Sequence, residues 1–181
     1  MLEINKHLIH KICIFGGQNV GKTSLIQKFA PEAFNIKRKP PSCINIAVKD
    51  LTINSTKVTL QIWILGSAID FKLIMPIFGK GSSGGIFMYD ITKHSSLLNV
   101  KDWLNAFKQG LSNDKKKIPI LMVGGKLDLQ EIRIISQKKA KKIVKKFKFI
   151  KYFECSAKTG ENVDKIFEFL TRAIMKSEGY F

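Results

Sequence analysis

Acidic residues are scarce in this sequence: 14 aspartates and glutamates stand against 31 lysines and arginines, giving a formal net charge of +17. A surplus of this size predicts an anionic partner, such as a lipid surface, a nucleic acid or a phosphate group, without choosing among them. The hydrophobic fraction of 45% and the charged fraction of 25% exclude a disordered or fibrous chain and are typical of a globular protein.

Cysteines and long apolar runs are also few. The three cysteines, Cys13, Cys43 and Cys155, have no paired spacing, which argues against a disulfide framework or a zinc site and favours a reducing cytoplasm. No apolar run is long enough to span a bilayer, and the first residues lack the apolar core of a secretory signal. Because the usual myristoylation and prenylation signals are absent too, we expect any membrane contact to be non-covalent and peripheral.

Short apolar runs alternate with amphipathic stretches along the chain. The later runs are continuously apolar, as expected where helices cover both faces of a parallel sheet. This pattern predicts one α/β domain over residues 1–181, with three α/β/α layers around a mostly parallel six-stranded sheet. The expected strands are 11–15, 46–53, 57–64, 84–90, 118–124 and 149–156, and the expected helices are 23–29, 97–109, 137–147 and 162–176.

The strongest local motif is a complete GxxxxGK[ST] pattern at residues 16–23, between the first expected strand and the first expected helix. Its glycines permit backbone conformations that aim N–H groups at phosphate oxygens, and the following helix adds its positive dipole end. Lys22 would meet the β and γ phosphates, and the Thr23 hydroxyl would ligate Mg²⁺. The motif predicts a nucleoside triphosphate site without identifying the base. The predicted phosphate-binding residues are Gly16, Gln18, Asn19, Val20, Gly21, Lys22, Thr23 and Ser24.

Two later segments should lie beside this loop, because each follows a strand of the same expected sheet: GGKLD at 124–128 and ECSAK at 154–158. A carboxylate such as Asp128 can accept both the N1–H and the N2–H₂ donors of guanine, which adenine does not offer. The segments resemble the NKxD and SAK elements of Ras-like small GTPases, with the Rab branch most similar, and the resemblance covers essentially the whole chain. It implies a Ras-like P-loop NTPase fold that binds GTP or GDP together with Mg²⁺.

The resemblance also implies a guanine site. The backbone N–H of Ala157 would donate to guanine O6, the Lys126 stem would pack on the base, and Phe34 would contact the ring edge. Gly125 stands where the family has an asparagine that ties the base-reading loop to the phosphate loop, so we expect weaker affinity with guanine preference retained. The implied guanine-binding residues are Phe34, Gly125, Lys126, Asp128, Ser156, Ala157 and Lys158.

Both switch segments depart from the family pattern. Small GTPases normally carry a DxxGQ element whose Asp supports Mg²⁺ and whose Gln orients the attacking water. In an ungapped register, Ile64 replaces the Asp, Ser67 the Gly and Ala68 the Gln, although Gly66 could substitute for the glycine. In switch I the Mg²⁺-binding threonine is a proline, which leaves Ser42 as the alternative hydroxyl. We therefore expect weakly held Mg²⁺ and slow or impaired GTP hydrolysis, with no catalytic residue assigned.

A lysine-rich stretch at 137–151 places apolar residues on one helical face and lysines around it. It is either a core-packed helix with a solvated face or a docking surface for anionic lipid. Nucleic acid is less favoured as a partner, because no aromatic platform or recognition motif accompanies the lysines.

Three functions fit the sequence as a whole. The favoured one is a monomeric, Rab-like GTP-binding switch or scaffold with little hydrolysis, a pseudoGTPase whose switch surface recruits protein effectors or regulators. The second is an active GTP hydrolase that cycles with a partner. The third is a basic membrane-surface module that no longer binds nucleotide.

Overall fold

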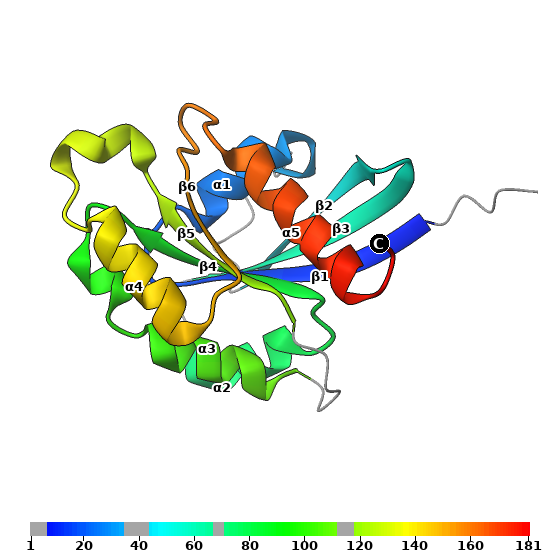
Figure 1. The fold of residues 1–181 in the computed structure, drawn as a ribbon, viewed down its shortest axis with the longest axis horizontal. Coiled ribbons are helices and arrows are strands. Elements are labelled where there is room, and N and C mark those ends of the chain that lie inside the picture. Colours follow the sequence, from blue (N-terminus) through cyan, green and yellow to red (C-terminus); the bar gives the residue numbers. More distant parts are fainter. Residues whose placement is uncertain (1–6, 35–43, 67–70, 112–117) are drawn as a thin grey trace, which may run out of the picture.

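The computed structural model describes residues 7–34, 44–66, 71–111 and 118–181, apart from the side chains of Phe34 and Phe71. Strands and helices alternate along most of these ranges (Figure 1). The strands are β1 (His7–Phe15), β2 (Ile44–Ile53), β3 (Thr56–Leu65), β4 (Gly84–Asp90), β5 (Ile120–Gly125) and β6 (Lys151–Glu154). The α-helices are α1 (Lys22–Phe29), α2 (Phe71–Gly79), α3 (Val100–Gln109), α4 (Gln137–Phe147) and α5 (Val163–Ser177), and the 3₁₀-helices are η1 (Pro31–Phe34), η2 (His94–Leu97) and η3 (Leu127–Ile132).

The strands form one six-stranded sheet in the order β2-β3-β1-β4-β5-β6. Only β2 runs antiparallel to its neighbour, and the remaining pairs are parallel. The β2–β3 hairpin closes at Asn54 and Ser55, whose φ angles of 47° and 65° give the left-handed turn that matches strand twist. The predicted mostly parallel six-stranded sheet is confirmed.

Helices cover both faces of the sheet (Figure 1). On one face, α1 and α5 bury residues such as Leu25, Ile26 and Phe167 against the strands. On the other face, α2, α3 and α4 contribute residues such as Phe78 and Phe107 to a second apolar cluster. Because apolar side chains leave water on both sides, the central strand β4 is buried along its whole length. The three-layer α/β/α prediction is confirmed.

Several boundaries differ from the sequence prediction. β1 begins at His7 rather than at residue 11, because parallel pairing with β3 from Lys57 onward holds its first residues, which alternate between exposed and buried. The expected helix at 97–109 begins only at Val100, after the separate η2, and the last strand is shorter than 149–156. Helix α2 is not predicted at all, since Pro76 lies inside it and a proline normally signals the end of a helix.

The parallel strands β1, β4, β5 and β6 all end at the same edge of the sheet, where open α/β folds place their ligands. The loops that follow β1, β5 and β6 therefore come together, although the first lies more than 100 residues before the other two in the sequence. Within the described ranges, no helix is long and apolar enough to cross a membrane.

Candidate nucleotide-binding site

The loop between β1 and α1 has the backbone of a phosphate cradle. Gly16, Asn19 and Gly21 have φ angles of 141°, 58° and 100°, in a region where residues other than glycine are rarely found. A β-carbon on Gly16 would lie 2.1 Å from the Met88 carbonyl oxygen, so β4 leaves room only for glycine there. Gly16 is thus required by backbone shape and by space, and Gly21 by backbone shape.

Lys22 begins helix α1 and points back into this loop. Its Nζ donates to the carbonyl oxygens of Gly16 at 2.9 Å and Gly17 at 2.7 Å, and the residue is only 7% exposed. Burial lowers the pKa of Lys22 to about 8, because the charged form loses hydration. The ammonium is therefore a confined cation at the centre of the loop. Around it, Gln18, Asn19, Thr23 and Ser24 are exposed, whereas Val20 is buried.

The loop after β5 contains the segment 124–128 that is predicted to read the base and is called the base-reading loop. It is anchored through Lys126. This residue has a left-handed φ of 67°, and its Nζ lies 2.6 Å from Oδ2 of Asp90 at the end of β4. Thr92 donates to the other oxygen of Asp90 from both its backbone N–H and its hydroxyl. Burial opposes ionisation of Asp90, but Lys126 and Thr92 hold its pKa below the ordinary value. The sequence analysis did not single out Asp90, whose signal was a lone acid ending an apolar strand.

Asp128 and Ser156 join the base-reading loop to the loop after β6. The Ser156 hydroxyl donates to Oδ1 of Asp128 at 2.6 Å, and the Leu127 N–H donates to the Cys155 carbonyl at 2.9 Å. Ser156 is fully buried, while Asp128 is exposed. The backbone N–H of Thr159 in turn donates to Oγ of Ser156. The two segments are thus held as one unit, with the Asp128 carboxylate directed by a buried hydroxyl.

A cavity of about 470 Å³ lies where the loops meet. Six predicted site residues line it: Gly21, Ser24, Lys126, Asp128, Ala157 and Lys158. Four other residues complete the lining and were missed by the sequence analysis: Gln27, Lys28, Met88 and Leu129. Gln27 and Lys28 belong to α1 and lie on the side of this helix that faces the cavity. The spacing of the phosphate-loop motif does not predict which side of the helix that is.

Other predicted residues stand apart from this cavity or outside the described residues. Gly125 is buried at the end of β5, where a β-carbon would lie 2.7 Å from the Val20 carbonyl oxygen. Phe34 belongs to η1, but its side chain lies outside what the structure describes, as do Ser42, Ser67 and Ala68 entirely. Gly66 is half-buried just after β3.

Ile64 is the one switch substitution whose surroundings the structure describes. It lies near the end of β3 opposite Ile14 of β1 and is 1% exposed within the apolar core. An apolar side chain buried there cannot bind a cation or the water that surrounds one. Among the described residues, no group of three or more His, Cys, Asp and Glu side chains could hold a metal ion.

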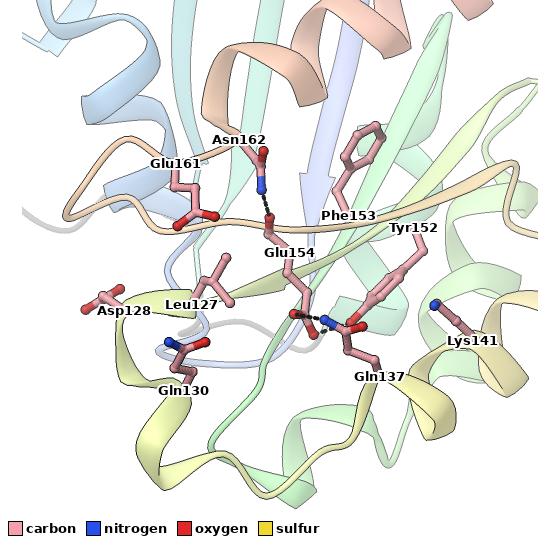
Figure 2. A pocket seen from close by; sticks show the side chains of 10 residues that line it. All are labelled: Leu127, Asp128, Gln130, Gln137, Lys141, Tyr152, Phe153, Glu154, Glu161 and Asn162. Carbon is pink, nitrogen blue, oxygen red and sulfur yellow. Dashed lines mark hydrogen bonds between the residues drawn. The ribbon is translucent and has the colours of Figure 1, made fainter.

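A second cavity, of about 590 Å³, lies on the other side of η3, and Figure 2 shows the residues that line it. At its wall, the Glu154 carboxylate accepts hydrogen bonds from Arg133, Gln137 and Tyr152. Burial raises the pKa of Glu154, but these bonds outweigh it and hold the pKa below its ordinary value. Asn162 donates to the Glu154 carbonyl at 2.9 Å (Figure 2). This network supports the start of the loop that carries Ser156.

A phosphate cradle at a strand-to-helix turn, on a mostly parallel sheet, defines a P-loop nucleotide-binding protein. The family model described as "Ras family" matches residues 11–176. The chain is 31% identical to Ras-related protein Rab-13 of Canis lupus familiaris over 179 residues, covering 99% of this chain and 86% of that protein. It is 30% identical to human Ras-related protein Rab-8B over 92% of this chain and 79% of that protein, and 32% identical to Ras-related protein RABG3d of Arabidopsis thaliana over 98% and 87%. The chain belongs to the Ras family of small GTP-binding proteins, in the Rab branch.

Proposed function

We propose that this protein binds GTP and GDP as a Rab-like switch or scaffold and hydrolyses GTP slowly. The proposal of slow hydrolysis rests on Ile64. In the ungapped register it occupies the position of the family's Mg²⁺-supporting aspartate, and its apolar side chain is buried in the core. Phosphoryl transfer depends on neutralising charge and positioning water, so a lost carboxylate slows hydrolysis more than binding.

Guanine recognition rests on Asp128. A carboxylate has about four acceptor positions, and the Ser156 hydroxyl takes only one of them, which leaves acceptors for the guanine N1–H and N2–H₂ groups. The backbone N–H of Ala157 donates to O6, Lys158 supports this loop, and the Lys126 stem covers the base while its ammonium stays on Asp90. Phe34 is assigned to the ring edge by the family resemblance alone.

The phosphates bind at the loop of residues 16–24. The ammonium of Lys22 already points into the loop. A phosphate oxygen can therefore replace the loop carbonyls as its partner without a large rearrangement of the Lys22 side chain. Backbone N–H groups of this loop and the start of α1 supply the remaining donors. The exposed hydroxyl of Thr23 fits a Mg²⁺ ligand, with Ser42 as a second hydroxyl, and the ion is held weakly because Ile64 offers no ligand.

Nucleotide preference is tested by measuring the affinity of the full chain for GTP, GDP and ATP, each with Mg²⁺ and with EDTA. We expect both guanine nucleotides to bind, more weakly than in the family but much more tightly than ATP, and we expect nearly equal GDP affinity in both buffers. The variant D128N, which replaces an acceptor with a donor, should weaken GDP binding and favour xanthosine diphosphate, whose C2 carbonyl is an acceptor. A preference for ATP in the unsubstituted chain contradicts the role of Asp128.

Slow hydrolysis is tested by single-turnover release of γ-phosphate, with protein in excess over GTP and Rab-13 as the standard. We expect release far slower than from Rab-13, and an increase in the variant A68Q, which restores the family's glutamine without touching the buried Ile64. Release as fast as from Rab-13 would instead establish the active hydrolase that cycles with a partner.

The switch surface offers apolar side chains to protein effectors or regulators. Ile46 and Val48 on the edge strand β2 are 50% and 51% exposed, and Leu73 and Ile77 on α2 are 73% and 76% exposed. Contiguous exposed apolar patches mark sites of protein association, and these four side chains are the candidates for such contacts. We expect residues 1–181 to act as one monomeric G domain, which light scattering coupled to size-exclusion chromatography checks with GDP bound.

We also propose that α4 docks on anionic membrane lipid. Eight lysines and no acidic residue occur from residue 137 to 151, and the six lysines of α4 are all exposed. None of these six forms an ion pair with a carboxylate anywhere in the described ranges. The apolar residues of α4, including Ala140 and Phe147, face the core, so the lysines are exposed to lipid headgroups, although Lys139 also contacts His94.

Co-sedimentation with phosphatidylserine-containing vesicles tests this proposal, with phosphatidylcholine vesicles as reference. Binding should be specific for the anionic vesicles and weaken as salt rises, because the lysines are exposed to screening. The variant K138E/K142E/K145E should lose binding, whereas K101E/K165E/K176E, with the same change in net charge on α3 and α5, should retain it. Equal losses contradict a specific α4 surface. If neither GDP nor GTP remains bound to the purified protein, the favoured alternative becomes a basic membrane-surface module that no longer binds nucleotide.

A further inference from the structure

Met88 lies beneath the point where the phosphate loop meets the base-reading loop. It belongs to β4, is 1% exposed and contributes to the wall of the 470 Å³ cavity. Its terminal methyl carbon lies 3.4 Å from the position that a β-carbon on Gly21 would occupy, and 2.7 Å from that of Gly125. One flexible side chain therefore touches both loops at once.

Gly125 is required by this packing and not by its backbone conformation. Its φ is not among the positive values of the described glycines, so any residue could adopt its conformation. A β-carbon there would lie 2.7 Å from both the Met88 methyl and the Val20 carbonyl oxygen, and real β-carbons do not come so close to other atoms. The two loops thus approach each other more closely than an asparagine at position 125 permits.

We propose that Met88 takes over the connection that the family's asparagine makes between these loops, and that Met88 and Gly125 form a matched pair that sets the spacing of the nucleotide site. The thioether replaces a directional hydrogen bond with dispersion contacts to the loop backbones. Both are positioning residues, because they act through the loops that contact the ligand. The inference rests on the proposed nucleotide binding.

A matched pair makes a definite prediction for single and double substitutions. M88V removes the methyl that supports both loops, and G125N inserts a side chain where no space exists, so each should weaken GDP binding about tenfold. In M88V/G125N, loss of the Met88 methyl removes one of the two clashes, and a shift of the Val20 backbone must relieve the other, so that the asparagine fits and its amide can donate to the Val20 carbonyl oxygen. The double variant should therefore bind GDP within about threefold of the unsubstituted chain.

The experiment is the dissociation rate of a fluorescent GDP analogue from the full chain and these three variants, measured in EDTA. The matched control is M122V, the same substitution at a fully buried methionine of β5 in the cluster on the other face of the sheet. Its double variant with G125N should show the sum of the separate losses. Additive losses in M88V/G125N as well would overturn the proposal.

Two milder variants keep the test decisive if G125N folds poorly. G125A adds only the clashing β-carbon, so it should accelerate GDP release, and M88V, which removes one of the two clashes, should reverse part of that effect. If the unsubstituted chain binds no nucleotide, the proposed function fails, and urea unfolding of the nucleotide-free variants then tests the pair alone. The same rescue of G125A by M88V supports the pairing, and its absence rejects it.

Discussion

The protonation state of Lys22 affects both nucleotide binding and the stability of the fold. Its pKa of about 8 belongs to the nucleotide-free protein, where burial opposes the charge. Phosphate binds the charged form, so above this pH binding must first take up a proton. The stability of the nucleotide-free protein depends on pH in the opposite direction. The unfolded chain binds more protons between pH 8 and 10.5, and the free energy of unfolding rises with pH across that window.

We predict that GDP affinity is flat below about pH 8 and falls above it, by up to about tenfold per pH unit. Calorimetric titrations from about pH 7 to pH 9 check this. The variant K22A should bind much more weakly and show no such step. An affinity of the unsubstituted chain that stays constant over the range contradicts the assigned role of Lys22.

Arg133 and Glu154 form a buried ion pair that supports the loop after β6. Their side chains are 20% and 6% exposed, and their atoms approach to 2.5 Å. R133A leaves the carboxylate without its cation, so we predict a loss of about 3 kcal/mol in the free energy of unfolding by urea. The control is R172A, whose partner Glu168 is 53% exposed. There the loss should stay below about 1 kcal/mol.

The pH dependence of this pair has a definite sign. The pKa of Glu154 lies below the ordinary value of a glutamate, so the pair stabilises the fold above that ordinary value and stabilises it less as acid protonates the carboxylate. In R133A the buried carboxyl accepts its proton at higher pH. The free energies of unfolding of the unsubstituted chain and of R133A should therefore become more similar below about pH 5. Equal costs for R133A and R172A at neutral pH would contradict the importance of burial.

At the scale of elements, α2 and α3 are in close contact at two glycines. A β-carbon on Gly110 would lie 1.8 Å from the Pro76 carbonyl oxygen, and one on Gly79 would lie 2.7 Å from the Phe107 carbonyl oxygen. Both obstacles are backbone atoms, which cannot rotate away. The second half of α2 is therefore held directly against the backbone of α3.

We predict that G110A lowers the free energy of unfolding by about 2 kcal/mol or more, because the two helices must separate. Gly179 provides the comparison. It has a φ of +83° with no atom near a potential β-carbon, so G179A introduces backbone strain alone and should cost about 1 kcal/mol. Urea unfolding of both variants checks the order, and a smaller cost for G110A contradicts the close contact.

Elements with a clear local pattern were predictable, and those stabilised by neighbours were not. The apolar run GGIFMYD predicts β4, and helix α4 begins at Gln137 as its period predicts, after the capping hydroxyl of Ser136. Helix α2 has a proline in its interior and forms because α3 and β3 cover its apolar side. The first half of β1 likewise depends on pairing with β3.

At the scale of the whole molecule, the nucleotide site joins loops that follow β1, β5 and β6, which lie far apart in the chain. A ligand that contacts all three stabilises the folded state against complete unfolding. We predict that GDP at about 100 times its dissociation constant raises the free energy of unfolding by about 2.7 kcal/mol. Differential scanning calorimetry checks this as a higher midpoint, with ATP at the same concentration as the control. An equal shift with ATP contradicts guanine selectivity.

The sequence by itself determined the three-layer α/β architecture, the phosphate loop at residues 16–23 and the family. These features are local, because each depends on the period of apolar residues or on glycine and lysine at fixed spacing. The tertiary structure alone decided that Lys126 meets Asp90, that Arg133 meets Glu154 and that Met88 lies against Gly125. Such contacts depend on which strands become neighbours and how closely their loops approach. Those distances arise from packing of the whole chain, and no short segment encodes them.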